Sequence, residues 1–154
     1  KPIFSAPRRI ANGVIMNKPT ILSDGTWLLC CSIWCDELSP LNDLPEERFS
    51  NVYASTDNSL TFTRIGYTDY PDRSTDEHMI VELRNKSLWM LIRGKHGIGQ
   101  GFSDDGGYTW RNIGFSGIEN SCSRFHIHRL KSGRLILINH KKYHWQETNN
   151  VIVG

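Results

Sequence analysis

Hydrophobic and polar positions follow a pattern that occurs three times along the chain. In each copy a short apolar segment, a polar turn and a second apolar segment predict a β-hairpin. The copies are residues 18–32 (KPTILSDGTWLLCCS), 79–93 (MIVELRNKSLWMLIR) and 126–140 (HIHRLKSGRLILINH). The turns are expected at Asp24-Gly25, Asn85-Lys86 and Ser132-Gly133, with Gly25, Ser87 and Gly133 matched as the last turn residue. No segment keeps the i, i+3, i+4, i+7 spacing of an amphipathic helix, so the pattern indicates an all-β fold.

A second repeated feature follows the first two hairpins. The stretch SDDGGYTW at residues 103–110 has a weaker copy, STDNSLTF, at residues 55–62, which is 48 residues earlier. Each stretch lies between two short apolar segments, so each unit has four antiparallel strands, the composition of a propeller blade. We expect a single domain over 1–154, with one blade at about 14–66, a second at about 77–114 and an incomplete third at about 123–154.

Composition and charge narrow the range of partners. The chain has 154 residues, of which 38% are hydrophobic and 22% charged, as in an ordinary globular domain. Its 18 basic and 16 acidic residues form no long run of one sign, so neither nucleic acid nor an anionic membrane surface is expected as a partner. No apolar run approaches the roughly 20 residues that span a bilayer. A secreted or periplasmic location is favoured, and a cytoplasmic one stays open.

Cysteine and histidine positions do not predict a metal site or a cofactor. Cys30 and Cys31 are neighbours on one expected strand, so their side chains point to opposite faces and suit a buried core better than a shared metal. A disulfide between Cys122 and another cysteine stays open. His126 and His128 share one strand face with no carboxylate or thiol at ligand spacing, although His140 or His144 is near in sequence.

The stretch at 103–110 resembles the Asp box, S-x-D-x-G-x-T-W, of sialidase-type propellers. The matching residues are Ser103, Asp105, Gly107, Thr109 and Trp110, and the weaker copy keeps Ser55, Asp57 and Thr61. The resemblance implies a structural turn at the rim of each blade, away from the catalytic face. We expect a buried Asp105 carboxylate that accepts turn N–H groups and a Trp110 ring that fills the gap between sheets.

A longer resemblance covers most of the chain, from about Asn17 to His140. The segments NKPTILSDGTWLL, DEHMIVELRNKSLWMLIRGKHGIGQGFSDDGGYTW and SRFHIHRLKSGRLILINH are similar to bacterial sialidase-like proteins with BNR repeats. This resemblance implies a partial propeller of a six- or seven-bladed parent and an exo-glycosidase that acts on acidic glycans. The F-R-I-P motif of sialidases is replaced by NKPT, so the sugar stays open.

Two other function classes remain open beside the sialidase-like hydrolase. Propellers of similar build include polysaccharide lyases that act on uronic acids with His and Arg side chains. A propeller that binds glycans without catalysis would need exposed aromatic platforms, for which Trp34 and Trp145 are candidates.

The candidate site lies where the innermost strand of each blade begins, as the resemblance implies. Alignment of Leu22, Leu83 and Leu130 places residues 16–18, 77–79 and 124–126 at equivalent positions. A guanidinium offers two parallel donors to a carboxylate, so the expected substrate-binding residues are Arg124, Arg93, Lys18 and His126. The candidates for proton transfer are Glu77, Asp76 and His78. A structural alternative pairs Glu77 with Arg93 or Arg124.

The last residues of the sequence lead to an expectation about assembly. The segment NNVIVG at 149–154 matches the third strand of the earlier units, and no further box follows it. An open arc of about three units would expose apolar blade faces and an edge strand near 151–153. We therefore expect self-association and weak activity.

Overall fold

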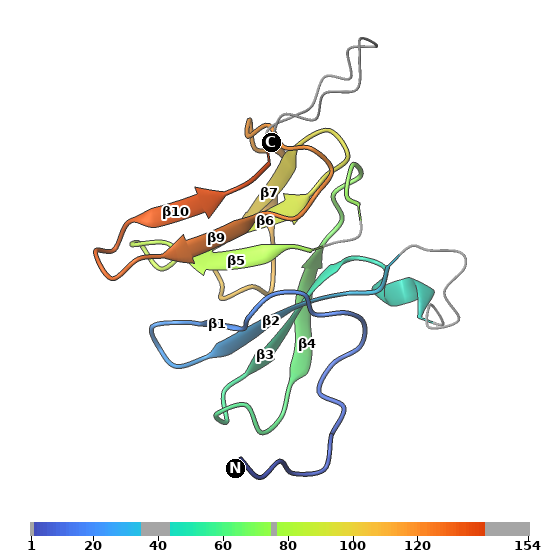
Figure 1. The fold of residues 1–154 in the computed structure, drawn as a ribbon, viewed down its shortest axis with the longest axis vertical. Coiled ribbons are helices and arrows are strands. Elements are labelled where there is room, and N and C mark those ends of the chain that lie inside the picture. The colour runs from blue at the N-terminus through green and yellow to red at the C-terminus, as the bar shows by residue number, and fades with distance from the viewer. Residues whose placement is uncertain (1, 35–43, 75–76, 141–154) are drawn as a thin grey trace.

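The computed structural model describes residues 2–34, 44–74 and 77–140. These residues form an all-β fold of two four-stranded antiparallel sheets and a two-stranded hairpin, arranged as propeller blades (Figure 1). The first blade contains β1 (Thr20–Ile21), β2 (Trp27–Ser32), β3 (Ser50–Ser55) and β4 (Thr63–Thr68), and a short 3-10 helix, η1 (Pro45–Glu47), precedes β3. The second contains β5 (Met79–Glu82), β6 (Leu88–Arg93), β7 (Ile98–Ser103) and β8 (Arg111–Phe115). The third unit is the pair β9 (His126–Arg129) and β10 (Leu135–Ile138). The predicted fold class is confirmed.

The three hairpin turns are built in the same way. In each turn the leucine N–H donates to the carbonyl four residues later at 2.8 Å, from Leu22 to Thr26, from Leu83 to Ser87 and from Leu130 to Arg134. The residue three positions after each leucine has a positive φ, and these residues are Gly25, Lys86 and Gly133. The match of Ser87 with the two glycines is therefore wrong by one residue, because Lys86 adopts the left-handed conformation that usually favours glycine.

Side-chain alternation along the strands builds two cores between the three units. Leu28 and Cys30 of β2 face the second blade, where they meet Ile80, Leu88 and Met90 in one buried cluster. On the other face of the second blade, a further cluster packs against the third unit, and it consists of Met79, Val81, Leu91, Ile98, Phe125 and Ile127. Neighbouring units therefore cover both faces of the second blade at its inner strands, whereas its outer strand β8 is largely exposed.

The cysteines follow the same alternation. Cys30 belongs to the core between the first two blades, whereas Cys31 lies in a separate cluster on the opposite face of the sheet. Burial raises the pKa of both thiols, that of Cys31 to about 12. Cys30, Cys31 and the exposed Cys122 are free thiols. Within the described residues, no group of three or more His, Cys, Asp or Glu side chains could hold a metal ion. None of the described helices has the length and apolar character of a membrane span.

Strand directions separate two ends of the molecule. The strands β1, β5 and β9 start at the same end, because Asn17 before β1 contacts the residues before β5, and Arg124 before β9 contacts Asn17. Figure 1 shows β5 and β9 side by side and running in the same direction. The hairpin turns and the stretches 55–62 and 103–110 lie at the other end, which we call the turn end; the end with Glu77 is the Glu77 end.

The stretch 103–110 is a hydrogen-bonded turn. Asp105 accepts hydrogen bonds from the backbone N–H of Tyr108 and Thr109, each at 3.0 Å, and from the Thr109 hydroxyl at 2.5 Å. The Ser103 hydroxyl donates to the same carboxylate at 2.8 Å and accepts from Gly107 N–H at 2.8 Å. The carboxylate of Asp105 is exposed, so its expected burial is wrong.

The weaker copy at 55–62 has an equivalent network. Asp57 accepts from the hydroxyls of Ser55 and Thr61, both at 2.6 Å, and from Thr61 N–H at 2.9 Å. These hydrogen bonds, led by the one from Ser55, lower the pKa of Asp57. The Trp110 ring packs against the core between the first two blades, as expected, and its indole N–H donates to Gly107 O at 3.0 Å.

The 103–110 turn also contacts the first blade through a glycine. A Cβ placed at Gly66 in β4 would lie 2.2 Å from the carbonyl oxygen of Gly107, so this close backbone approach requires glycine. Gly114 lies 48 residues later at the equivalent position of β8, and a Cβ there would meet nothing within 4 Å. We expect Gly66→Ala to lower the free energy of unfolding by about 3 kcal/mol and Gly114→Ala to change it by less than about 0.5 kcal/mol. Urea unfolding of both variants tests this, and equal stabilities would contradict the described contact.

The Asp105 network predicts a dependence of stability on pH. Desolvation raises the pKa of Asp105, but the hydrogen bonds from Thr109, Ser103 and Tyr108 outweigh it and lower the pKa from 3.8 to about 2. A carboxyl with a lowered folded-state pKa stabilises the fold above its unfolded pKa, and this contribution is lost as the pH falls from about 4 to about 2. Because Asp105 is exposed, we expect Asp105→Asn to cost about 1 kcal/mol at pH 7 and progressively less at lower pH.

Asp104→Asn is the matched control for this experiment. Among the described residues, the Asp104 carboxylate forms only an exposed ion pair with Arg111 at 2.7 Å, and such pairs contribute little. Urea unfolding between pH 7 and pH 2 measures both variants against the parent chain. Asp105→Asn that unfolds like Asp104→Asn across this range would show that the turn network does not stabilise the fold.

Candidate functional site

A groove of about 650 Å³ runs along the inner strands of the three units. It begins at the Glu77 end beside Met16, Asn17, Lys18 and Arg124, and it continues between β1, β5 and β9. Two exposed histidines, His126 and His128, project from β9, with ring centroids 6.1 Å apart. Each unit contributes its innermost strand, so the groove depends on the packing of all three.

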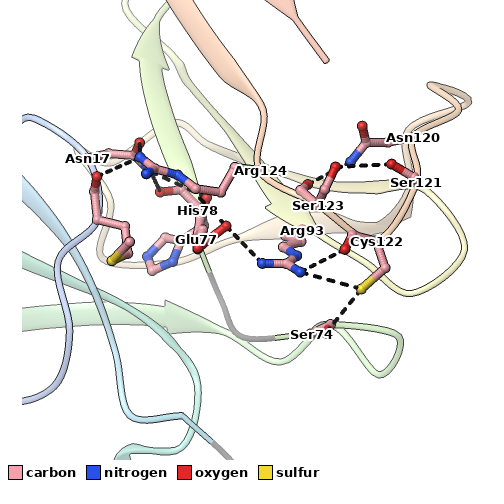
Figure 2. Close-up of polar contacts among 11 residues, drawn as sticks. Asn17, Ser74, Glu77, His78, Arg93, Asn120, Ser121, Cys122, Ser123 and Arg124 are labelled. Atoms are coloured by element: carbon pink, nitrogen blue, oxygen red, sulfur yellow. Dashed lines mark hydrogen bonds and ion pairs between the residues drawn. The ribbon is translucent and has the colours of Figure 1, made fainter. Parts of the chain in front are cut away.

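A buried carboxylate joins two arginines at the start of this groove (Figure 2). Glu77 precedes β5 and is 6% exposed. Its Oε2 atom lies 3.0 Å from Nη1 of Arg93, at the end of β6, and 3.9 Å from Nε of Arg124, which precedes β9. A carboxylate removed from water requires such partners, because an unpaired buried charge is costly. The structural alternative paired Glu77 with Arg93 or Arg124, and in the structure Glu77 contacts both arginines.

Arg93 is largely enclosed by its contacts. Its side chain is 19% exposed, and its Nη2 donates to the carbonyl of Cys122 at 2.7 Å and lies 3.9 Å from the Cys122 sulfur. The thiol of Cys122 in turn donates to the Ser74 hydroxyl at 3.3 Å. Arg93 thus joins β6 to the loop before β9 and leaves no terminal nitrogen free of contacts among the described residues.

Arg124 is more open than Arg93. Its side chain is 50% exposed, and its Nη2 donates to Met16 O at 2.8 Å and to Asn17 Oδ1 at 3.3 Å. Within the described residues its Nη1 atom has no hydrogen-bond partner. Lys18 is exposed beside it at the same groove. These two cations are therefore the ones that an incoming anion can reach.

His78 lies outside the groove, next to the Glu77 pair in sequence. Its ring is 1% exposed, with Nε2 2.8 Å from the carbonyl oxygen of Asn51 and Nδ1 3.3 Å from the Ser32 hydroxyl. A carbonyl oxygen only accepts, so Nε2 carries a proton. The ring is enclosed by the first blade, and the expectation that it transfers a proton to a substrate is not met by this geometry.

Other charged groups in the groove already have partners. The Glu82 carboxylate accepts from the Ser23 N–H at 2.9 Å and the Ser23 hydroxyl at 2.7 Å, and it lies 3.8 Å from Lys86 Nζ. Arg129 donates to the carbonyl oxygens of Gly133 and Glu82. These contacts hold neighbouring units together at the turn end. The available charge of the groove is consequently positive.

The structure brings together most of the residues predicted from the sequence. Glu77, Arg93 and Arg124 meet, and Lys18 and His126 line the adjacent groove. Several predicted positions lie outside the described residues, namely Asp76, His144, Trp145 and residues 151–153. Trp34 is half-buried, and its indole nitrogen is enclosed.

Sequence reasoning missed the roles of Asn17 and Cys122. The leucine alignment includes Asn17 among the expected strand starts. Its side-chain amide is neutral, however, so the residue type gives no reason to expect a contact with Arg124. Cys122 contacts Arg93 mainly through its backbone carbonyl, which no residue type reveals.

Comparison with known proteins agrees with this architecture. The family model of the BNR repeat-like domain matches residues 3–149, which is nearly the whole chain. No curated protein sequence gives a significant match to it. The repeated four-stranded units, the repeated turns and the length of this match lead to one conclusion: the chain belongs to the BNR repeat-like domain family.

Proposed function

We propose that this chain provides the ligand-binding end of a sialidase-like carbohydrate-active enzyme that acts on acidic glycans. The observation that carries the proposal is the meeting of Asn17, Glu77 and Arg124, each from the start of a different inner strand, beside a groove with positive available charge. The resemblance to sialidase-type propellers implies a ligand site where such strand starts converge, and an acidic sugar supplies the complementary charge.

Arg124 and Lys18 are the proposed carboxylate-binding residues. The free Nη1 of Arg124 offers N–H donors in a fixed plane, and the exposed ammonium of Lys18 adds a second positive charge. Arg93, which the sequence also suggested as a ligand contact, is occupied by Glu77 and Cys122. Its proposed role is to hold the Glu77 carboxylate in place, not to bind the sugar.

The reaction needs groups other than Glu77. Hydrolysis of a glycosidic bond uses one group to protonate the leaving oxygen and another to attack or to activate water. The Glu77 carboxylate lies between two arginines and is enclosed, so its proposed role is to position them. Asp76 remains the proposed acid of the hydrolase.

A uronic-acid lyase is the second candidate, and the exposed histidines favour it. His126 and His128 line the groove near Arg124 and Lys18. Within the described residues their rings stack on each other and form no hydrogen bond. An imidazole can accept the proton next to a carboxylate whose charge arginine neutralises. This arrangement requires no second carboxylate in the groove.

Arg124→Gln tests the anion site directly. We expect the parent chain to bind galacturonic acid or N-acetylneuraminic acid in low salt and galactose much more weakly, because only the acids carry a carboxylate. Loss of the guanidinium should weaken acid binding at least tenfold, which corresponds to about 1.4 kcal/mol. Arg111→Gln, at the turn end, is the control and should bind as the parent does. Calorimetry that finds equal affinity in Arg124→Gln would contradict the site.

Product analysis separates the two reactions. Sialyl and uronyl oligosaccharides are incubated with the protein, and the products are identified by mass spectrometry. A hydrolase adds one water and releases a saturated sugar, whereas a lyase adds none and leaves an unsaturated uronyl product. We expect the lyase product to disappear in His126→Gln or His128→Gln if the second candidate is correct. A saturated product that persists in both variants supports the hydrolase and contradicts the lyase.

A further inference from the structure

Asn17 contacts both of the other units at the Glu77 end (Figure 2). It precedes β1, and its Nδ2 donates to the backbone carbonyls of Glu77 at 3.4 Å and His78 at 3.3 Å, in the second unit. Its Oδ1 accepts from Nη2 of Arg124 at 3.3 Å, in the third unit. One side-chain amide therefore joins the starts of three inner strands that are far apart in the sequence.

The orientation of this amide follows from its partners. Backbone carbonyls only accept, so the NH₂ group must face Glu77 and His78, and the oxygen must then face the guanidinium, which only donates. No other arrangement of the amide satisfies all three contacts. The oxygen of Asn17 is thus fixed by the second unit and offered to the third.

We propose that Asn17 is a positioning residue that sets the Arg124 guanidinium for anion binding. This inference rests on the proposed function, in which Arg124 binds the carboxylate of an acidic glycan. Asn17 acts through Arg124 and does not itself contact the ligand.

The contacts of Arg124 explain why a positioning residue is effective here. The side chain is half exposed, and a free arginine side chain must lose its rotamer freedom when it binds a ligand. Asn17 and Met16 hold Nη2, and Glu77 faces Nε, so the guanidinium plane is fixed before any ligand arrives. The nitrogen Nη1 remains available. Fixing the donors in advance reduces the entropy cost of binding, which raises affinity.

The same contacts link ligand binding to the packing of the units. Arg124 takes its position from Asn17 of the first unit and Glu77 of the second. An anion that binds to Arg124 in this position must therefore stabilise the arrangement of all three units, since ligands that bind only the folded state raise its stability.

Three variants test the proposal on the whole chain. Asn17→Ala removes both contacts of the amide. Asn17→Asp keeps an oxygen for Arg124 but loses the N–H donors and places a negative charge beside the anion site. Asn12→Ala is the matched control, because Asn12 donates to Glu47 at 3.2 Å, away from Arg124. Affinity for galacturonic acid is measured by calorimetry in low and high salt, below the unfolding temperature of each variant, which thermal melts establish.

We expect Asn17→Ala to bind galacturonic acid about tenfold more weakly than the parent, and Asn12→Ala to bind as the parent does. Asn17→Asp should bind more weakly than Asn17→Ala in low salt, and this difference should shrink in high salt because ions screen the added charge. A residue with a merely structural role would lower the melting temperature of Asn17→Ala but leave its affinity for galacturonic acid, measured below that temperature, unchanged. Galacturonic acid should also raise the melting temperature of the parent more than that of Asn17→Ala.

The outcomes separate this inference from the proposed function. If the parent binds the acid, Arg124→Gln does not, and both Asn17 variants bind as Asn12→Ala does, the inference is overturned and the anion site stands. If the parent binds no acidic sugar, the proposed function and the inference both fail. If only Asn17→Asp folds, binding that stays weaker than that of Asn12→Ala in high salt, where the added charge is screened, supports the proposal, and equal binding there overturns it.

Discussion

The enclosed carboxylate of Glu77 is the constraint on which the arrangement of the Glu77 end depends. A carboxylate that is 6% exposed is tolerated only with charged or hydrogen-bonding partners, and Arg93 and Arg124 supply them from two different units. Loss of one partner of such a pair typically costs about 3–5 kcal/mol, because the other charge stays buried. The end of β6, the loop at Cys122 and the start of β9 are all held close to Glu77 by this requirement.

The antiparallel repeat places the stabilising turns at one end of the molecule and the candidate ligand-binding side chains at the other end. Turns at one end are closed by short polar networks such as those of Asp57 and Asp105, and these networks are satisfied within the turn. Loops at the other end bring Asn17, Glu77 and Arg124 together at the starts of three inner strands. Glu77 and Arg124 are at equivalent positions, and Asn17 is one residue further along. The apolar faces between the units join the two ends rigidly. The turn networks therefore stabilise the fold apart from the candidate site, whereas Glu77 at the other end serves both the packing of the units and the candidate site.

Much of this organisation could be predicted from the sequence because the repeat fixes it. Alternation and turn residues gave the three hairpins, and alignment of Leu22, Leu83 and Leu130 placed Glu77 and Arg124 at equivalent strand starts. Equivalent positions of adjacent blades lie side by side, so their contact followed from the alignment alone. The Trp110 ring lies between the first two blades for the same reason.

Side-chain direction and exposure could not be predicted in the same way. His78 follows Glu77 directly, yet its ring is enclosed by Asn51 and Ser32, because neighbours along an extended segment point to opposite sides. Asp105 satisfies the turn from an exposed position, since its donors belong to the turn itself. Lys86 adopts a positive φ that its residue type does not suggest. Each of these features depends on local backbone geometry, which the spacing of apolar residues does not indicate.

A crystal structure of the chain with an acidic monosaccharide would show whether Arg124 and Lys18 form the anion site. We expect the sugar carboxylate to lie within hydrogen-bond distance of Arg124 Nη1 and close to Lys18, with Glu77 still paired to Arg93. A carboxylate bound elsewhere on the molecule, or an Arg124 side chain turned away from Glu77 and Asn17 in the complex, would contradict this expectation.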